Sequence, residues 1–512
     1  MPTGVNITPV IFFFFWQQYS QEVKLTMKDF RIKSVLVIFC VLTGLVCINV
    51  FNISMIKHAH LSTMASNQRK QTEAIGSYRG CIYDKNMIPL ANALMLSGDE
   101  DYDTAFEKRY SFSSVCRHTV GYAFAGGEGI CGLEKTFDSE LKDGSTLNIT
   151  HTKDPFGNLL SDKPVAIENA SYIPKSNLKT TIDYKIQKIA EEAADKHIER
   201  GAIVIIDIEN FDVAAMVSRP NFDQSDIKSC LGSEGSPLMN KAICAYNAGS
   251  IFKTITAAAM LSCGTGSDAT FECAGVYNAD GKDFLCNKKD GHGLINFKTA
   301  YAKSCNSFFY SGGIEVSGKA IYDAAKKFSL GKKLLNCDIG ESEGIVSQRD
   351  VYTKRECANM SIGQGEILVT PLQAANIVAI VANAGVAKRI NLADSIVDER
   401  GAVIKNLRLE GSERIISKED ALILADMMRE AVLEGTAQAV QNGIVAVAGK
   451  TGSAQTGWIE NGETMTHGWF CAFFPYENPK YAMAVFAENG KNGSSSCIPP
   501  FREIVLKINE LY

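Results

Sequence analysis

A serine followed three residues later by a lysine can carry out nucleophilic chemistry, and Ser250 and Lys253 form such a pair. Residues three apart on a helix share one face, with Cβ atoms about 5–6 Å apart. A lysine beside the hydroxyl can remove its proton if burial or a neighbouring cation lowers the pKa of the amine. The pair is therefore a candidate for acyl transfer to a serine.

The spacing alone is a weak signal, because six serines match it: Ser54, Ser139, Ser176, Ser225, Ser250 and Ser329. Ser250 differs from the others because it opens the run SIFKTITAAAML, which has few helix breakers and enough apolar residues for a buried helix. A nucleophile at the N-terminus of a buried helix gains from the helix dipole and from free N–H groups. We therefore predict that Ser250 is the nucleophile.

A glycine followed by Lys450 and Thr451 could instead indicate a phosphate-binding loop. That loop needs G-x-x-x-x-G-K-[ST], but Gly443 and Gly449 enclose five residues here rather than four. The run before Lys450 is also strand-like, and the residues after Gly452 are a poor helix start. The nucleotide interpretation is therefore disfavoured, and Lys450-Thr451-Gly452 becomes a candidate edge of an acyl-transfer site.

The triplet Ser304-Cys305-Asn306 completes a set of three motifs. It lies between Ser250 and Lys450 in the chain. The order S-x-x-K, S-x-N, K-T-G is the pattern of penicillin-binding proteins and class A β-lactamases. On these residues the chain resembles a class B penicillin-binding protein, a membrane-anchored peptidoglycan D,D-transpeptidase.

The resemblance covers nearly everything after Ile56. It includes four segments: YRGCIYDKN (78–86), NKAICAYNAGSIFKT (240–254), GQGEILVTPLQAANIVAIVANAG (363–385) and HGWFCAFFP (467–475). The departures from the family pattern are small. Ala248 replaces the usual proline, Cys305 occupies the middle of S-x-N, and Ser453 follows K-T-G where threonine is common. Ser453 keeps a hydroxyl at that position.

The resemblance implies catalytic roles for four residues. Ser250 would attack the carbonyl between the terminal D-alanines of a stem peptide, with Lys253 as the base. Ser304 would relay a proton to the departing D-alanine amine, helped by the charge of Lys450. An amine from a neighbouring stem peptide would then resolve the acyl-enzyme and form a cross-link.

It also implies substrate-binding roles for the residues around them. Asn306 would hold the peptide amide, and Thr451 with Ser453 the terminal carboxylate. Gly452 belongs to the same substrate-binding strand. The backbone N–H groups of Ser250 and Ser453 would form the oxyanion hole. No metal, nucleotide or other cofactor is expected.

Other functions remain open on the sequence alone. Water in place of the amine would make the chain a D,D-carboxypeptidase or a serine β-lactamase, although no deacylating glutamate motif is evident. A non-catalytic cell-wall scaffold or a β-lactam sensor is the remaining alternative. The expected partners are peptidoglycan stem peptides, lipid-linked glycan strands, β-lactam antibiotics, and a membrane glycosyltransferase of the division, elongation or sporulation machinery. The near balance of 52 basic and 57 acidic side chains gives no indication of nucleic-acid binding.

An uncharged run from Ser34 to Ile56 is long enough to cross a bilayer core of about 30 Å. Basic residues are more frequent before this run than directly after it, which favours a cytoplasmic segment over residues 1–33. The expected location is the cytoplasmic membrane, single-pass, with the catalytic domain on the outer face. A cleaved signal peptide is the alternative, but no small-residue cleavage site follows the run. Met27 could be the true start, with residues 1–26 an upstream extension.

Behind the anchor at 34–56, the resemblance implies a mixed α/β pedestal over 57–172 and a penicillin-binding transpeptidase domain over 173–512. The run 201–220 has the pattern of a β-hairpin, and three strand-like runs near the end follow a set of helical stretches. Strands at both ends of a domain predict one antiparallel sheet completed by both termini, an α+β fold. The family fold adds flanking helices and an all-helical subdomain.

The 15 cysteines do not form the evenly spaced framework of a disulfide-stapled domain. No Cys-x-x-Cys pair or histidine cluster indicates a zinc site. We expect most of the thiols to be buried and reduced. Cys273 and Cys286 flank an Asn-Ala-Asp-Gly turn that could fold a hairpin, so a disulfide between them stays open.

Overall fold

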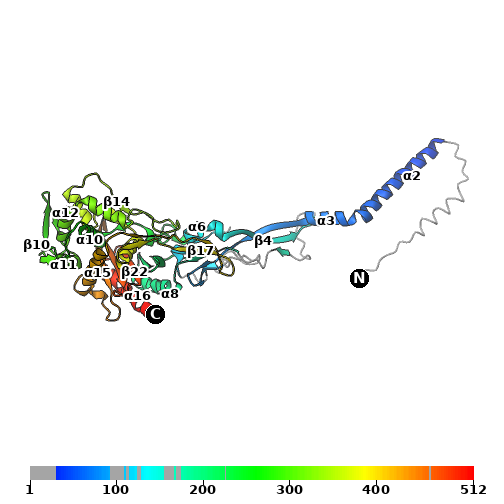
Figure 1. The fold of residues 1–512 in the computed structure, drawn as a ribbon. Coiled ribbons are helices and arrows are strands. Elements are labelled where there is room, and N and C mark those ends of the chain that lie inside the picture. The colour runs from blue at the N-terminus through cyan, green and yellow to red at the C-terminus, as the bar shows by residue number, and fades with distance from the viewer. Residues whose placement is uncertain are drawn as a thin grey trace. The chain divides into compact units, whose positions relative to one another are not determined.

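The computed structural model describes residues 30–92, 109–110, 115–123, 128–154, 166–168, 175–224, 226–460 and 463–511 (Figure 1). These residues belong to two compact units. The first holds the described residues up to Glu73 and from Thr150 to Ala166, and the second holds the remainder. Most of residues 1–33, including Met27, lies outside the described residues. The boundaries 57–172 and 173–512 stay predictions.

The first unit is mainly helical. Helix α2 (Phe30–Phe51) continues through a π-helical turn, η1 (Asn52–Ile56), and α3 (His58–Arg69) follows. The segment Lys33–Ile56 is the one span among the described residues that is long and apolar enough to cross a membrane. Its apolar side chains are exposed, as expected for a helix whose partner is lipid. The predicted anchor coincides with this span.

Short elements and long strands make up the region that the sequence predicts as a pedestal. Strands β1 (Lys70–Arg79), β4 (Lys142–Thr152) and β5 (Ala166–Glu168) form one sheet in the order β1-β4-β5. Three short helices lie between β1 and β4 in the chain: α5 (Arg117–Val120), α6 (Gly132–Thr136) and α7 (Asp138–Leu141).

A fully buried ion network organises this region of the second unit. Glu134 accepts from Arg79 at 2.5 Å and from Arg109 at 2.7 Å, and all three side chains are completely buried. The hydroxyl of Tyr110 donates to the same carboxylate at 2.8 Å. Burial alone would raise the pKa of Glu134, but the charges of Arg109 and Arg79 outweigh it and hold that pKa below its ordinary value. The network is structural.

The main sheet is antiparallel, with strand order β20-β21-β22-β7-β8. Its strands are β20 (Ala448–Glu460), β21 (Glu463–Phe474), β22 (Tyr481–Ala487), β7 (Gly201–Asp207) and β8 (Asp212–Arg219). Strands from the start and end of the domain therefore meet in one sheet, as the sequence predicted.

Helices cover both faces of this sheet, which is why its inner strands β22 and β7 are apolar almost throughout. On β7, Ile203 and Ile205 pack against α8 (Tyr184–His197) and α16 (Gly493–Leu511). The alternate residues Val204 and Ile206 belong to the core on the opposite face, with α14 (Pro371–Ala382) and α15 (Lys418–Leu433). The two-residue period of the strand sends its side chains to opposite faces.

A helical layer on the second face carries the candidate site. It contains α10 (Lys253–Ser262), α11 (Phe297–Ala302), α12 (Asn306–Lys327) and α13 (Lys354–Ser361). Two small hairpins lie between α10 and α11 in the chain. One pairs β10 (Thr270–Cys273) with β13 (Gly293–Asn296), and the other pairs β11 (Val276–Ala279) with β12 (Lys282–Leu285). The hairpin expected between Cys273 and Cys286 is confirmed.

A second five-stranded sheet has the order β18-β17-β6-β2-β3. Its strands are β18 (Val403–Asn406), β17 (Ala393–Val397), β6 (Asn177–Thr180), β2 (Ile82–Tyr83) and β3 (Pro89–Ala91). The smaller pairings join β14 (Ile345–Val346), β15 (Ile367–Val369) and β9 (Tyr246–Asn247), and join β16 (Val386–Lys388) to β19 (Ser412–Arg414).

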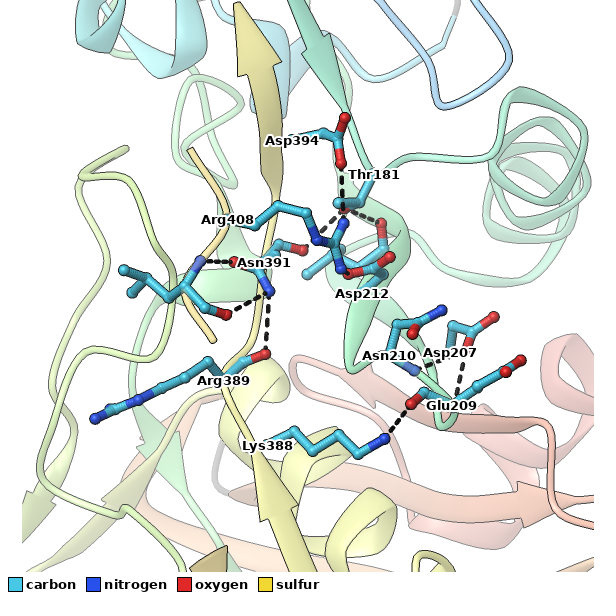
Figure 2. A network of polar contacts seen from close by, with 12 residues as sticks. Thr181, Asp207, Glu209, Asn210, Asp212, Lys388, Arg389, Asn391, Asp394 and Arg408 are labelled. Atoms are coloured by element: carbon cyan, nitrogen blue, oxygen red, sulfur yellow. Dashed lines mark hydrogen bonds and ion pairs between the residues drawn. The ribbon is translucent and has the colours of Figure 1, made fainter. Parts of the chain in front are cut away.

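Polar contacts attach this second sheet to the β7–β8 hairpin of the main sheet (Figure 2). Arg408 donates to Asp394 on β17 at 3.0 Å and to Asp212 at the start of β8 at 2.6 Å. The hydroxyl of Thr181 lies 3.0 Å from the carbonyl of Val213 and 2.9 Å from that of Asn391. Side chains and backbone therefore cross-link the two sheets.

Candidate active site

Ser250 lies in a 3-10 turn, η3 (Gly249–Phe252), immediately before α10. The sequence predicted that the α-helix begins at Ser250, whereas the structure begins it at Lys253. The chain enters the turn from β9, which is held by pairing of Tyr246 with Val369. Ser250 is partly exposed, and its hydroxyl has no hydrogen-bond partner within the described part of the chain.

Gly249 brings the serine turn against the K-T-G strand. Its φ is +54°, and a Cβ at this position would lie 2.8 Å from the carbonyl oxygen of Ser453. On its other side, the N–H of Gly249 donates to the carbonyl of Gly363 at 3.0 Å, and a Cβ on Gly363 would collide with Gly249. At position 249, only glycine fits both the backbone conformation and the available space.

Lys253 is completely buried and hydrogen-bonds to the S-x-N motif. Its Nζ donates to the carbonyl of Ser304 at 2.7 Å, to the hydroxyl of Ser304 at 3.1 Å and to Oδ1 of Asn306 at 2.7 Å. The ring of Phe309 lies under the amine, 5.4 Å from Nζ to the ring centroid. Burial lowers the pKa of Lys253 to about 7. A substantial neutral fraction near pH 7 is what a general base requires.

The S-x-N motif is held in an uncommon backbone conformation. Ser304 is buried and has φ +56°, and the N–H of Cys305 donates to the carbonyl of Ala300 at 2.8 Å. Cys305 is the N-cap of α12, with its sulfur accepting from the N–H of Phe308 at 3.5 Å. Asn306 starts that helix and is partly exposed, so its amide can contact a ligand.

Lys450 and Thr451 lie on β20, facing this group. Lys450 is 1% exposed, with Nζ 3.0 Å from the carbonyl of Thr451 and 5.8 Å from the ring centroid of Tyr301. Burial, together with the charge of nearby Lys253, holds the pKa of Lys450 well below its ordinary value. The hydroxyl of Thr451 shares a hydrogen bond with that of Thr436.

Gly452 and Ser453 continue this strand beside the serine turn. A Cβ on Gly452 would lie 3.3 Å from the backbone nitrogen of Ile251, so the strand passes close to the residue after Ser250. Ser453 is exposed, and its hydroxyl accepts from the N–H of Gly493 at 3.3 Å. The structure therefore brings together all eight residues predicted for the site.

The cysteine interpretation needs a correction. Cys273 and Cys286 are both free, so the disulfide that the sequence left open is absent in the structure. Instead, their sulfurs converge with His292 and with Cys305 of the S-x-N motif. This grouping is neither a Cys-x-x-Cys pair nor a histidine cluster, and no local pattern in the sequence marks it, because its members come from separate hairpins and a helix cap.

Two contacts of the site were not anticipated from sequence. Thr436 follows α15 and contacts Thr451, and Gly363 supports the turn at Gly249. No local pattern marks Thr436 as a partner of a strand residue. The G-x-G around Gly363 was a usable signal for a close backbone approach.

Comparisons with known proteins identify the family to which the chain belongs. The family model described as penicillin binding protein transpeptidase domain matches residues 201–506. The chain is 28% identical over 404 residues to Stage V sporulation protein D of Bacillus subtilis, covering 75% of this chain and 60% of that protein. It is 28% identical over 449 residues to the peptidoglycan D,D-transpeptidase PbpA of Mycolicibacterium smegmatis, covering 83% and 86%.

A solved structure shares the fold. It is the imipenem acyl-enzyme complex of penicillin-binding protein A from M. tuberculosis, with a TM-score of 0.70 and 22% identity, covering 85% of this chain and 99% of that chain. The chain therefore belongs to the penicillin-binding protein transpeptidase family, as a class B penicillin-binding protein. It spans 60% of the length of the sporulation protein that it matches.

Proposed function

We propose that this chain is a peptidoglycan D,D-transpeptidase that acts through an acyl-enzyme on Ser250. One observation carries the proposal: a single, largely buried site brings together Ser250, Lys253, Ser304 and Lys450. A serine beside a buried lysine supplies the nucleophile and base. The pKa of the second lysine, Lys450, is lowered in the free protein, and the carboxylate of a bound stem peptide would favour its charged form.

In the first step, the Ser250 hydroxyl attacks the carbonyl carbon between the two terminal D-alanines, and neutral Lys253 takes its proton. The lowered pKa of Lys253 supports this role. The oxyanion is held by the N–H groups of Ser250 and Ser453, a preorganised arrangement worth about 3–4 kcal/mol per donor. The closeness of Gly249 to Ser453 supports this pairing.

The tetrahedral intermediate then collapses, breaking the C–N bond and expelling D-alanine. The proton on Lys253 passes through the Ser304 hydroxyl to the departing amine, and the 3.1 Å contact between Nζ and Oγ supports that route. Positive charge on Lys450 favours the hydroxyl's transient loss of a proton. Asn306 holds the substrate amide, and Thr451, Gly452 and Ser453 hold the terminal carboxylate.

The amine of a second stem peptide resolves the ester on Ser250, forming the cross-link and releasing the serine, which recovers its proton. The donor strands are lipid-linked glycans, so a membrane glycosyltransferase is the natural partner. The segment Lys33–Ile56 supports anchoring in a membrane. On the proposed function, the catalytic domain lies on the outer face of the cytoplasmic membrane. β-Lactams acylate the same serine.

The test uses the full chain in detergent, with lipid-linked disaccharide-peptide and a glycosyltransferase to polymerise it. Muramidase digestion followed by mass spectrometry is expected to show dimeric stem peptides, with one D-alanine released per cross-link. Ser250→Ala should abolish both products. D-alanine release without dimers would contradict transpeptidation and support a carboxypeptidase.

A further inference from the structure

A groove on the second unit is lined by an excess of basic side chains. It encloses about 750 Å³ and lies between the end of α12 and the paired strands β16 and β19. Its charged lining residues are Lys326, Lys327, Lys332, Lys333, Lys388 and Arg389 against Asp323, Glu410 and Glu413. Because the chain as a whole carries a formal charge of −5, the groove concentrates positive charge on an acidic protein.

The loop that follows α12 is anchored in the core. Phe328 and Leu330 are both 0% exposed and fix the turn that the chain makes there. Asn376 on α14 donates to the carbonyl of Phe328 at 3.3 Å, and Gln373 on the same helix donates to the carbonyl of Lys332 at 3.1 Å. The side chain of Lys332 itself is exposed. The backbone that carries these lysines is therefore held in place without a ligand.

A second segment carries two further cations beside this loop. A parallel bridge joins Leu335 to Ile390, which places Lys388 and Arg389 next to the loop. Nζ of Lys388 donates to the carbonyl of Glu209, whereas Arg389 contributes only its backbone carbonyl to the network of Figure 2. The guanidinium of Arg389 extends away from that network and is exposed (Figure 2). The loop and this segment thus supply the cations of one groove.

Most of these cations have no ion-pair partner. Within the part of the chain that the structure describes, Lys333 is the one lining cation with a carboxylate inside 4.0 Å, that of Asp338 at 3.0 Å. Asp323 is already paired with Lys319 at 2.6 Å, so it does not neutralise the groove. Like charges lining one groove repel one another, since the Debye length at 0.1 M salt is about 10 Å. A bound anion would relieve that repulsion.

The type of cation indicates the type of anion. Five of the six lining cations are lysines, whose ammonium is a strongly hydrated point charge with three rotatable donors. Arginine is suited to bidentate recognition of an anion in one fixed geometry, whereas lysine binds phosphate as a point charge. Lysines distributed along a groove therefore match repeated phosphate groups on a flexible chain.

The shape of the groove favours a polymer over a membrane surface. The lining includes Asn376 and Ile390, which are 3% and 2% exposed, so part of it lies below the protein surface. A planar array of lipid headgroups cannot enter such a groove, whereas a single extended chain can. The carboxylates of Glu410 and Glu413 are exposed on the β19 side and would repel an anion, so the chain would follow the lysines.

We propose that this groove binds a linear polymer whose repeating charge is a phosphate group. The binding cations are Lys326, Lys327, Lys332, Lys388 and Arg389. None of the groove's lining residues belongs to the candidate active site, so this is a separate site that does not depend on the proposed function. With the catalytic domain on the outer face of the membrane, as proposed above, the polymer would be one of the cell envelope and would retain the domain there.

Equilibrium binding of fluorescently labelled linear polyphosphate to the full chain in nonionic detergent tests the proposal. The wild type should bind, with a Kd that rises with salt. The triple variant Lys327→Gln/Lys332→Gln/Arg389→Gln should bind about 100-fold more weakly, because each cation near an anionic surface contributes about fivefold. Its slope of log Kd against log salt concentration should be smaller by about 2. Should this variant fail to fold, Lys332→Gln alone should weaken binding about fivefold.

Two matched controls separate the groove from net charge. The triple variant Lys185→Gln/Lys188→Gln/Lys228→Gln removes the same charge from exposed lysines outside the groove. It should weaken binding by less than about threefold, because screening limits the effect of distant charges. Glu413→Gln, which removes a repelling carboxylate, should tighten binding. Acylation of Ser250 by penicillin should leave polyphosphate binding unchanged, and a chain that is never acylated but binds polyphosphate would contradict the proposed function alone.

Several results would overturn the proposal. Absence of binding by the wild type at low salt would do so, as would equal weakening in the two triple variants, because binding would then follow net charge. Loss of polyphosphate on acylation would assign the binding to the lysines of the active site instead. Poly(glutamate) that binds as tightly as polyphosphate would contradict the preference for phosphate. Phosphatidylglycerol vesicles that bind through the groove residues, when polyphosphate does not, would assign the groove to a lipid surface.

Discussion

Nζ of Lys253 lies 2.7 Å from Oδ1 of Asn306, so the residue proposed as base in the first motif is directly bonded to the second motif. The same amine contacts Ser304 through both its carbonyl and its hydroxyl. A completely buried ammonium group must find its hydrogen-bond acceptors within the protein, and Ser304 and Asn306 supply those acceptors to Lys253. The two motifs are therefore a single hydrogen-bonded unit.

Penicillin acylation should depend on the protonation of Lys253. Below its pKa of about 7 the amine is protonated and cannot accept the proton of Ser250, so the acylation rate should fall about tenfold per pH unit. Above that pKa the rate should level off. Stopped-flow labelling across pH, with circular dichroism to verify folding, measures this, and a rate that is flat across the interval would exclude Lys253 as the base.

Gly249→Ala should disrupt the oxyanion hole. The new Cβ would lie 2.8 Å from the carbonyl of Ser453, in a backbone conformation with φ +54°, so the serine turn and the strand must separate. A displacement of about 1 Å costs on the order of 100-fold in rate, which is the expected loss in the acylation rate constant.

Gly281→Ala is the matched control. Gly281 also has positive φ, +77°, but nothing lies within 4 Å of the added Cβ. Gly281→Ala should therefore introduce a similar backbone strain but leave the acylation rate constant unchanged. Equal effects of the two substitutions on acylation would show that strain, rather than the approach to Ser453, is responsible.

Glu134→Gln should destabilise the protein by about 3–5 kcal/mol, because it leaves two buried arginines without their shared counterion. Urea denaturation with a probe in this region measures the change. Glu399→Gln, at an exposed turn, should change stability by less than about 0.5 kcal/mol. A loss for Glu134→Gln no larger than that of the control would show that the network is not stabilising.

The pH dependence of this contribution has a definite sign. The pKa of Glu134 is lowered in the folded state, so its contribution is fully present above its unfolded pKa of about 4.3. It is lost as the pH falls through the lower folded pKa. Wild type and Glu134→Gln should therefore converge in stability as the pH falls below about 4.

The fold was largely predictable because its strands and helices carry local patterns. The continuous apolar run of β7 and the amphipathic face of α8 follow from the residue order alone. Asp183 caps α8 by accepting from the N–H groups of Lys185 and Ile186, a start signal visible in the sequence. These features depend on near neighbours in the chain.

The rest depends on contacts between distant segments. No local sequence pattern near Lys253 predicts that its amine contacts Asn306, and none near Thr451 predicts its hydrogen bond with Thr436. The convergence of Cys273 with Cys305 requires two hairpins to fold back onto α12. Tertiary packing sets these contacts. The order of the motifs in the sequence therefore predicted which residues form the site, but not which of them hydrogen-bond to one another.

Labelling by fluorescent penicillin tests the central claim most directly. The full chain in detergent should form one covalent adduct, and peptide mapping should place it on Ser250. Ser250→Ala should remain unlabelled while keeping the wild-type unfolding transition. A wild-type protein that stays unlabelled, an adduct on another residue, or a labelled Ser250→Ala variant would contradict the account.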